Sequence, residues 1–214
     1  MLQNLWNSYY CNGSYWWFDM KYNWFILVII TSLLFSGCIN SNNSNTTEEE
    51  KVSVNQQKLL DEGWNLSNEN QSRDLSSTYG VTPIYGTLDN YFDIKMGKGS
   101  DLVLKIIDLS KDKCIRYIYV QENSEYTVSQ IPQGKYKLLI AYGRKWMTQQ
   151  KDGKYWGKFA DNAYYEQSVD IFDFGKKNSR EMVNYLLTIN VQESLHTTNF
   201  TTKEISEEEF YNVK

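Results

Sequence analysis

Apolar and polar residues alternate along much of the chain after residue 85. In DLVLKIIDL, residues 101–109, the alternation places Leu102, Leu104 and Ile106 on one side of an extended strand. A period of two predicts strands with one buried face, because successive side chains of a strand point to opposite sides. The same period predicts further strands at 90–96, 114–120, 169–174 and 182–191, and two more within 124–143.

Short polar turns separate the predicted strands. Proline lacks a backbone N–H and glycine accepts a positive φ, so PQG at 132–134 predicts a tight turn. Within CIRYIYV the alternation places Ile115, Tyr117 and Tyr119 on the same face. Short strands at regular spacing are typical of sandwiches and barrels. We therefore expect an all-β fold, an antiparallel β-sandwich, over residues 85–195.

The alternation breaks between residues 144 and 168, in a long segment rich in aromatic side chains. A connection of this length is uncommon in a domain unless it packs or has a function. One interpretation is that the rings fill a small core beneath a long loop, since each aromatic side chain buries roughly 150–250 Å². The other is that some of them form an exposed binding surface. These residues are Trp146, Tyr155, Trp156, Phe159, Tyr164 and Tyr165.

An uninterrupted apolar run lies near the start of the chain. WFILVIITSLLFSG, residues 24–37, has no charge and is shorter than the roughly 20 residues that span a bilayer. With Lys21 before it, the run has the length and the flank of a signal peptide, which we place at 20–37. Residues 1–19 lack Lys and Arg. We expect them to be an upstream extension from a mis-assigned start, or else a genuine aromatic extension at the bilayer interface.

The end of this run, LLFSGC, resembles the lipobox of prokaryotic lipoprotein signal peptides. In that family a small pair precedes an invariant cysteine, whose thiol takes a diacylglycerol before the chain is cut ahead of it. The resemblance implies lipidation of Cys38 and a place in the cell envelope, anchored to the membrane with the domain on the extracytoplasmic side. Two or more acyl chains make a lasting anchor. The alternative is an uncleaved signal-anchor helix, which would make a single-pass membrane protein.

Polar sequence flanks the predicted sandwich on both sides. NSNNSNTTEEEK, residues 40–51, has too little apolar surface to offset the entropy of an ordered chain. We therefore expect a flexible tether over 38–84, in which Leu59 and Leu60 can lie on one side of a short helix. The acidic ending, residues 196–214, is expected to be a solvated C-terminal tail.

Composition narrows the chemistry of the chain. Its 214 residues carry a net charge of −4, which argues against nucleic acid as a partner. Cys114 has no intramolecular partner once residues 1–37, which include Cys11, are removed and Cys38 is lipidated, and we expect it to be a small buried residue. The single histidine, His196, supports neither a metal site nor a Ser-His-Asp triad. Asp170 and Asp173 fall on opposite faces of a strand. We expect no catalytic residue, metal or cofactor, and hence no enzyme.

YTVSQIPQGKYKLLIAYG, within 124–143, resembles the F-x-I-x-x-[IL]-P-x-G-x-Y-x-L strand–turn–strand of carboxypeptidase-regulatory-like, prealbumin-like (transthyretin-like) β-sandwiches. Over roughly residues 88–210, GKGSDLVLKIIDL, GKFADNAYYEQSVDIFDF and ISEEEF are similar in order to an uncharacterised family of secreted or lipid-anchored microbial proteins. The resemblance implies a prealbumin-like sandwich with a long aromatic insertion. It gives no activity that can be carried over.

Within the insertion, Trp146 and Phe159 fall on the family's pattern, and we expect them to be packed. Tyr155 and Trp156 lie in MTQQKDGKYW, which departs from that pattern, and we expect them to be exposed. An exposed Trp–Tyr pair can stack on a sugar or a peptide side chain, so these two are the candidate binding residues. The sequence predicts a non-catalytic, lipid-anchored envelope module that binds a glycan or an envelope protein, or acts as a scaffold. An accessory subunit of an envelope complex is the alternative.

Overall fold

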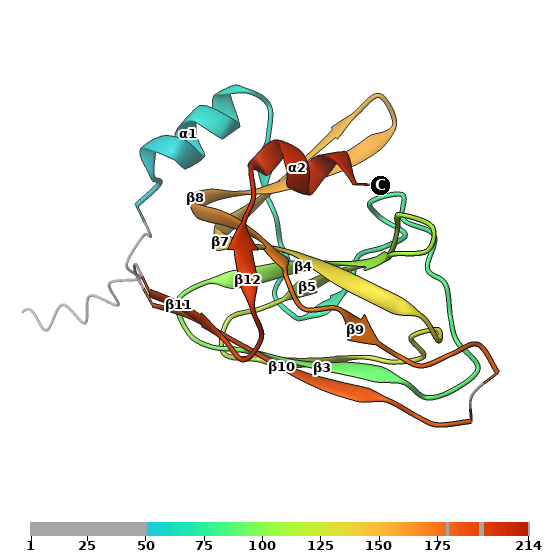
Figure 1. The fold of residues 1–214 in the computed structure, drawn as a ribbon. Helices are drawn as coiled ribbons and strands as arrows, with labels where there is room; N and C mark the ends of the chain where they lie inside the picture. Colours follow the sequence, from blue (N-terminus) through green and yellow to red (C-terminus); the bar gives the residue numbers. More distant parts are fainter. Residues whose placement is uncertain (1–50, 179, 193–194, 214) are drawn as a thin grey trace, which may run out of the picture. The chain divides into compact units, whose positions relative to one another are not determined.

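The computed structural model describes residues 51–213, apart from 179 and 193–194. Cys38, the predicted signal peptide and the upstream extension lie outside the described residues. The described chain folds into two β-sheets that pack face to face, with two short helices beside them (Figure 1). The prediction of an all-β sandwich is confirmed.

The larger sheet has the strand order β12-β8-β7-β4-β5-β2, and β1 and β9 also pair with β7. Its central strands β4 and β5 are buried on both faces, which explains why their sequences are almost continuously apolar. The strands of this sheet are β1 (Asn65–Leu66), β2 (Arg73–Asp74), β4 (Asp101–Asp108), β5 (Lys113–Val120), β7 (Lys135–Lys151), β8 (Lys154–Ser168), β9 (Phe172–Asp173) and β12 (Thr202–Glu204).

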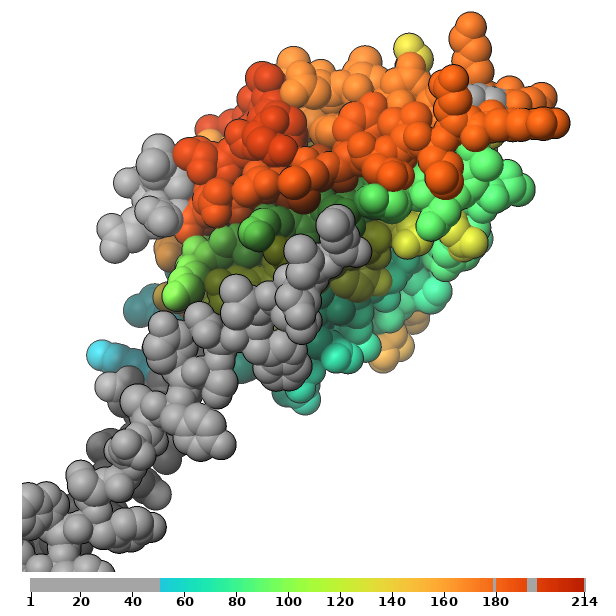
Figure 2. Space-filling model, turned by 90° about the horizontal axis from the view of Figure 1, so that it is seen from below, coloured from blue at the N-terminus to red at the C-terminus, as the bar shows by residue number. Residues whose placement is uncertain are grey.

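The smaller sheet has the order β11-β10-β3-β6. β10 runs parallel to β3, which departs from the antiparallel arrangement that the sequence predicts. The parallel pairing is possible because the chain passes through the larger sheet between these two strands. Figure 2 shows β10 (orange-red) beside β3 (green) on the outer face of this sheet. The strands are β3 (Tyr91–Met96), β6 (Glu125–Val128), β10 (Asn184–Gln192) and β11 (Leu195–Thr198).

The sandwich core lies between the two sheets. Leu104, Ile106 and Leu138 of the larger sheet meet Leu187 and Ile189 of the smaller one, and all five side chains are buried. The inward face that the alternation predicts for β4 is therefore confirmed. In the smaller sheet, where Leu186 on the outer face is exposed, a register slip by one residue would bring Leu187 and Ile189 to the surface.

A second apolar layer covers the opposite face of the larger sheet. Tyr117 and Tyr119 belong to this layer and not to the sandwich core that holds Ile115, so the predicted alternation in β5 is wrong. The reason is a β-bulge, because Ile106 pairs with Arg116 while the next residue of β4 pairs with Cys114. Ile115 is the extra residue, and an extra residue reverses the faces of those that follow.

Residues 51–84 do not form the predicted tether but belong to the folded domain. The predicted short helix is present as α1 (Val54–Asp61), where the Ser53 hydroxyl accepts a hydrogen bond from the backbone of Gln56 at 3.0 Å. Its Leu59 packs against the hairpin formed by β7 and β8, and β1 and β2 join the larger sheet. Two-residue strands have no period, so the sequence pattern could not reveal them.

The segments expected to be an irregular insertion and a solvated tail are also regular structure. Residues 144–168 form the distal halves of β7 and β8, joined as one long hairpin. The acidic ending forms β11, β12 and α2 (Glu207–Asn212), and Phe210 is fully buried in the second apolar layer. Ser206 and Glu209 form a capping box, and acidic residues in the first turn interact favourably with the helix dipole.

Candidate functional site

The β7–β8 hairpin carries the residues that the sequence singles out for binding. The two strands pair continuously from Trp146 and Phe159 to Lys151 and Lys154. Asp152 and Gly153 form the connection between the strands, with φ values of 51° and 72°. Two successive residues with positive φ make a tight type I′ turn, which the Asp-Gly sequence favours. In Figure 1 this hairpin projects beyond the sheets beside α2.

The base of the hairpin is packed on both faces. Trp146 and Phe159 are each 3% exposed, and their rings meet edge to face at 4.7 Å between centroids. Gly157 lies so close to the Trp146 indole that an added Cβ would overlap it. The Tyr211 hydroxyl of α2 donates a hydrogen bond to the Gly157 carbonyl at 2.7 Å. The prediction that Trp146 and Phe159 are packed is confirmed.

The hairpin tip, which we define as residues 150–156, is exposed along its whole length. Tyr155 is 45% exposed and Trp156 is 42% exposed, as the sequence predicts. Adjacent residues of a strand point to opposite faces, so these two rings lie on different sides of the ribbon. They therefore do not form the single flat platform that stacking on one sugar would use.

Lysines accompany the exposed tryptophan. Lys151 and Lys154 are direct cross-strand partners in the last pair before the turn, on the same face as Trp156. The side-chain ammonium groups of these two lysines have no ion-pair or hydrogen-bond partner within the described part of the chain. Lys158, four residues after Lys154 on β8, instead pairs with Glu207 at 3.2 Å and lies over the Trp64 ring. The tip thus combines two aromatic side chains with two lysines and one carboxylate, that of Asp152, and its net charge is +1.

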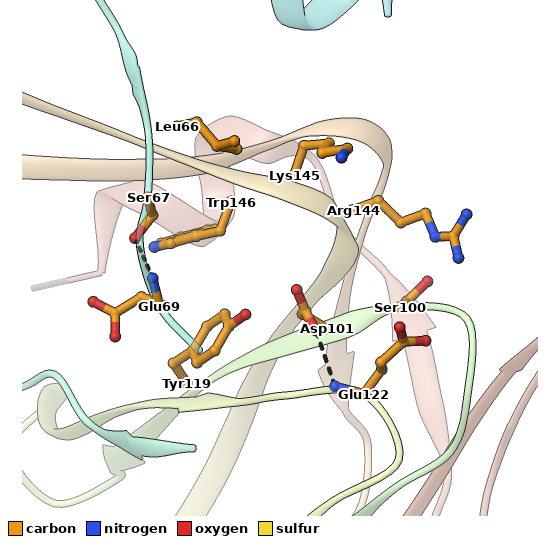
Figure 3. Close-up of a pocket in the computed structure, with 10 residues that line it drawn as sticks. All are labelled: Leu66, Ser67, Glu69, Ser100, Asp101, Tyr119, Glu122, Arg144, Lys145 and Trp146. Atoms are coloured by element: carbon orange, nitrogen blue, oxygen red, sulfur yellow. Dashed lines mark hydrogen bonds between the residues drawn. The ribbon is translucent and has the colours of Figure 1, made fainter. Parts of the chain in front are cut away.

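A shallow pocket of about 250 Å³ lies where the hairpin leaves the sheet (Figure 3). The pairing of β7 with β8 is irregular here, and Lys145 has a positive φ of 58°. Figure 3 shows Arg144 pointing away from the Trp146 ring. The Asp101 carboxylate accepts a hydrogen bond from the Glu122 backbone at 2.9 Å. The lining residues are Leu66, Ser67, Glu69, Ser100, Asp101, Tyr119, Glu122, Arg144, Lys145 and Trp146.

This pocket could not be found from the sequence, because its lining comes from four separate segments of the chain. Its lining combines carboxylates with cations and gives no charge of one sign for a ligand to match. The carboxylates also serve the fold, since that of Glu122 accepts a hydrogen bond from the Gly99 backbone at 2.7 Å. We therefore take the hairpin tip, and not the pocket, as the candidate functional site.

Buried polar groups elsewhere hold the fold together. Cys114 is buried, as the sequence predicts, and burial raises the pKa of its thiol to about 11, so the thiol is protonated at neutral pH. Lys105 is buried beside it and donates hydrogen bonds to the Phe210 and Val213 carbonyls at 2.7 and 3.1 Å. Burial lowers the pKa of Lys105 to about 8. Through its two hydrogen bonds, this lysine holds the C-terminal end of α2.

His196, Asp170 and Asp173, which the sequence analysis considered for catalysis, each contact a group that belongs to the fold. The His196 ring lies 3.2 Å from the Tyr142 hydroxyl, through Nδ1. Asp170 accepts a hydrogen bond from the Thr201 backbone at 2.8 Å, while Asp173 lies 3.3 Å from the Lys135 ammonium. Within 51–213, excluding the three undescribed positions, no cluster of His, Cys, Asp or Glu is arranged to hold a metal ion. Neither helix in this range is long and apolar enough to cross a membrane.

Comparison with known proteins adds no relative to this picture. No family model, no curated protein and no solved structure matches the chain.

Proposed function

We propose that this protein is a non-catalytic module of the cell envelope, anchored by a lipid on Cys38, which contacts another molecule through the β7–β8 hairpin tip. One observation supports the hairpin tip as the contact site. Tyr155 and Trp156 stay exposed at the end of a hairpin whose other large aromatic side chains are packed. Folding buries the aromatic residues that it needs, so rings exposed together on a projecting tip favour a role in contact with another molecule.

The sequence supports the anchor and the class of protein. The ending LLFSGC resembles a lipobox, the 124–143 stretch resembles prealbumin-like sandwiches, and roughly residues 88–210 resemble a family of secreted or lipid-anchored proteins. A sandwich of this kind presents its hairpins and loops on a rigid frame, which suits binding or scaffolding. The contact partner in this proposal is a component of the envelope, such as a glycan, an envelope protein or the membrane itself.

Replacement of the lipidated cysteine tests the anchor. We expect Cys38→Ser to release the protein from the membrane fraction and to abolish incorporation of a labelled fatty acid. The lipid label distinguishes a lipoprotein from a signal anchor, which would keep the variant in the membrane pellet without label. Cys114→Ser, which changes a buried cysteine, is the matched control and should leave both the label and the membrane fraction unchanged.

Replacement of the tip aromatics tests the contact site. The unit Glu49–Lys214, which contains all three apolar clusters, would be screened against glycans, envelope proteins and lipid vesicles. We expect the Tyr155→Ala/Trp156→Ala variant to lose the binding that the unchanged unit shows. Met182→Ala/Leu186→Ala, which removes two other exposed apolar side chains, should retain it. Equal binding by both variants would rule out the tip as the contact site.

A further inference from the structure

The hairpin tip presents an aromatic ring on each of its two faces. Tyr155 and Trp156 follow each other on β8 and therefore point to opposite sides of a two-stranded ribbon. A flat partner that lies against one face would bury one ring and leave the other in water. Both rings are buried together only where the tip enters a medium that surrounds it. The headgroup region of a bilayer is such a medium, and it is where Trp and Tyr are enriched in membrane proteins.

The charges of the tip favour a surface of opposite sign. Lys151 and Lys154 lie directly opposite each other, an arrangement that destabilises a hairpin because like charges repel. No carboxylate among the described residues pairs with either lysine. Asp152 in the turn offsets one of the two charges, so the tip carries a net charge of +1 on a chain whose net charge is −4. An anionic lipid surface relieves the repulsion and attracts both side chains.

We propose that the hairpin tip inserts into the interfacial region of an anionic bilayer, with Tyr155 and Trp156 at the depth of the headgroups and Lys151 and Lys154 on the lipid phosphates. This inference rests on the proposed function in taking the tip as the contact site, and it names the partner of that site. The membrane contact is separate from the lipid on Cys38, and it fixes the orientation of the domain.

The dimensions of the chain allow both contacts on one membrane. The Ser53 hydroxyl donates a hydrogen bond to Asp161 at 2.6 Å, which fixes the start of α1 beside β8. From Asp161 to Lys154 is seven residues along the strand, roughly 23 Å at about 3.3 Å per residue. Fifteen residues separate Cys38 from Ser53, and by covalent geometry they reach at most roughly 50 Å. A chain anchored at Cys38 can therefore place the tip on the same bilayer.

Vesicle binding by the unit Glu49–Lys214, which lacks Cys38, tests the inference without the anchor. The unit is mixed with phosphatidylcholine vesicles with or without phosphatidylglycerol, and the bound fraction is measured by sedimentation. We expect binding only to the anionic vesicles, and its loss near 1 M salt, where the Debye length is about 3 Å. Lys151→Gln/Lys154→Gln should weaken binding about 25-fold, at roughly fivefold per lysine near the surface. Lys176→Gln/Lys177→Gln, two other exposed lysines, is the matched control and should change binding little.

The depth of the tip has its own readout. The unit contains three tryptophans, Trp64, Trp146 and Trp156. We expect brominated lipids to quench the fluorescence of the unit in anionic vesicles, and Trp156→Phe to remove most of that quenching. Thermal melts of each variant show that it is folded. Quenching that survives Trp156→Phe would place another part of the domain in the bilayer and overturn the inference.

The outcomes separate this inference from the proposed function. Absence of binding to anionic vesicles, or binding that is the same for both lysine variants, overturns the membrane inference. If the tip variant Tyr155→Ala/Trp156→Ala then loses binding to a glycan or an envelope protein, the proposed function stands with a different partner. If the tip variant keeps all binding that the unit shows, both proposals fail.

Discussion

Lys105 is an ammonium group buried among aromatic rings, and it binds the C-terminal end of the last helix. Its Nζ lies 4.7 Å from the centre of the Phe210 ring and 5.6 Å from that of Tyr117. Carbonyls at a helix end carry partial negative charge, so a cation there is favourable. Removal from water opposes this contact, and it lowers the pKa of Lys105 from 10.5 to about 8.

The lowered pKa of Lys105 gives folding a defined dependence on pH. Between pH 8 and 10.5 the folded state has lost this proton while the unfolded chain keeps it, so stability rises with pH. The contribution of Cys114 to stability falls as the pH rises above 9, because burial raises the pKa of its thiol from 9.0 to about 11 and the folded state keeps the proton that the unfolded chain loses. From pH 8 to 9 we expect the free energy of unfolding to rise by about 1 kcal/mol from Lys105. Denaturant melts should show this rise in the unchanged protein and not in Lys105→Met, whereas equal slopes would contradict it.

Arg116 is a second buried charge, and the sequence pattern did not reveal it. It is 1% exposed and lies 3.8 Å from the Asp74 carboxylate. The guanidinium donates hydrogen bonds to the carbonyls of Ile84 and Ile115, at 2.7 and 2.8 Å. A charged residue in an alternating strand is expected on the solvent side. Here it donates to the carbonyl of the bulge residue before it and to that of Ile84, and the second contact joins parts of the chain that are 32 residues apart.

Among the strands, the sequence predicted their positions better than the way in which they pair with one another. The strands at 91–96, 101–108 and 184–192 were recognised because one face of each is apolar and the period is local. The bulge at Ile115 could not be recognised, because it depends on pairing with β4. The hairpin of β7 and β8 did have a local signal, the Asp-Gly pair, which favours a two-residue turn. The aromatic composition of the segment concealed it.

The C-terminal helix shows how an acidic ending contributes to the core. Phe210 is fully buried, and its ring lies 5.5 Å from that of Tyr165. We expect Phe210→Ala to lower the free energy of unfolding by about 3–5 kcal/mol, the usual cost of removing a buried phenylalanine ring. Glu208→Gln on the exposed side of the same helix should change it by less than about 0.5 kcal/mol. Chemical denaturation measures both. Equal small effects would mean that the ending is the solvated tail that the sequence predicts.

At the scale of the molecule, the larger sheet is the frame on which the rest is placed. The smaller sheet covers one face, while α2 and the segment at 75–81 pack on the other. The far end of the β7–β8 hairpin extends beyond these covered faces, and no sheet or helix of the described residues buries its tip. The exposure of Tyr155 and Trp156 follows from this arrangement, and it was predicted from the sequence. Their opposite orientation was not, because it requires the strand assignment.

In the proposed function, Tyr155 and Trp156 serve contact with another molecule and not folding. The free energy of unfolding of Tyr155→Ala/Trp156→Ala, measured in denaturant beside that of Trp146→Ala, distinguishes these two roles. We predict a loss below about 1 kcal/mol for the tip variant and about 3–5 kcal/mol for Trp146→Ala, whose ring is buried. A loss of about 3 kcal/mol or more for the tip variant would show that Tyr155 and Trp156 are core residues and that the proposed contact site is wrong.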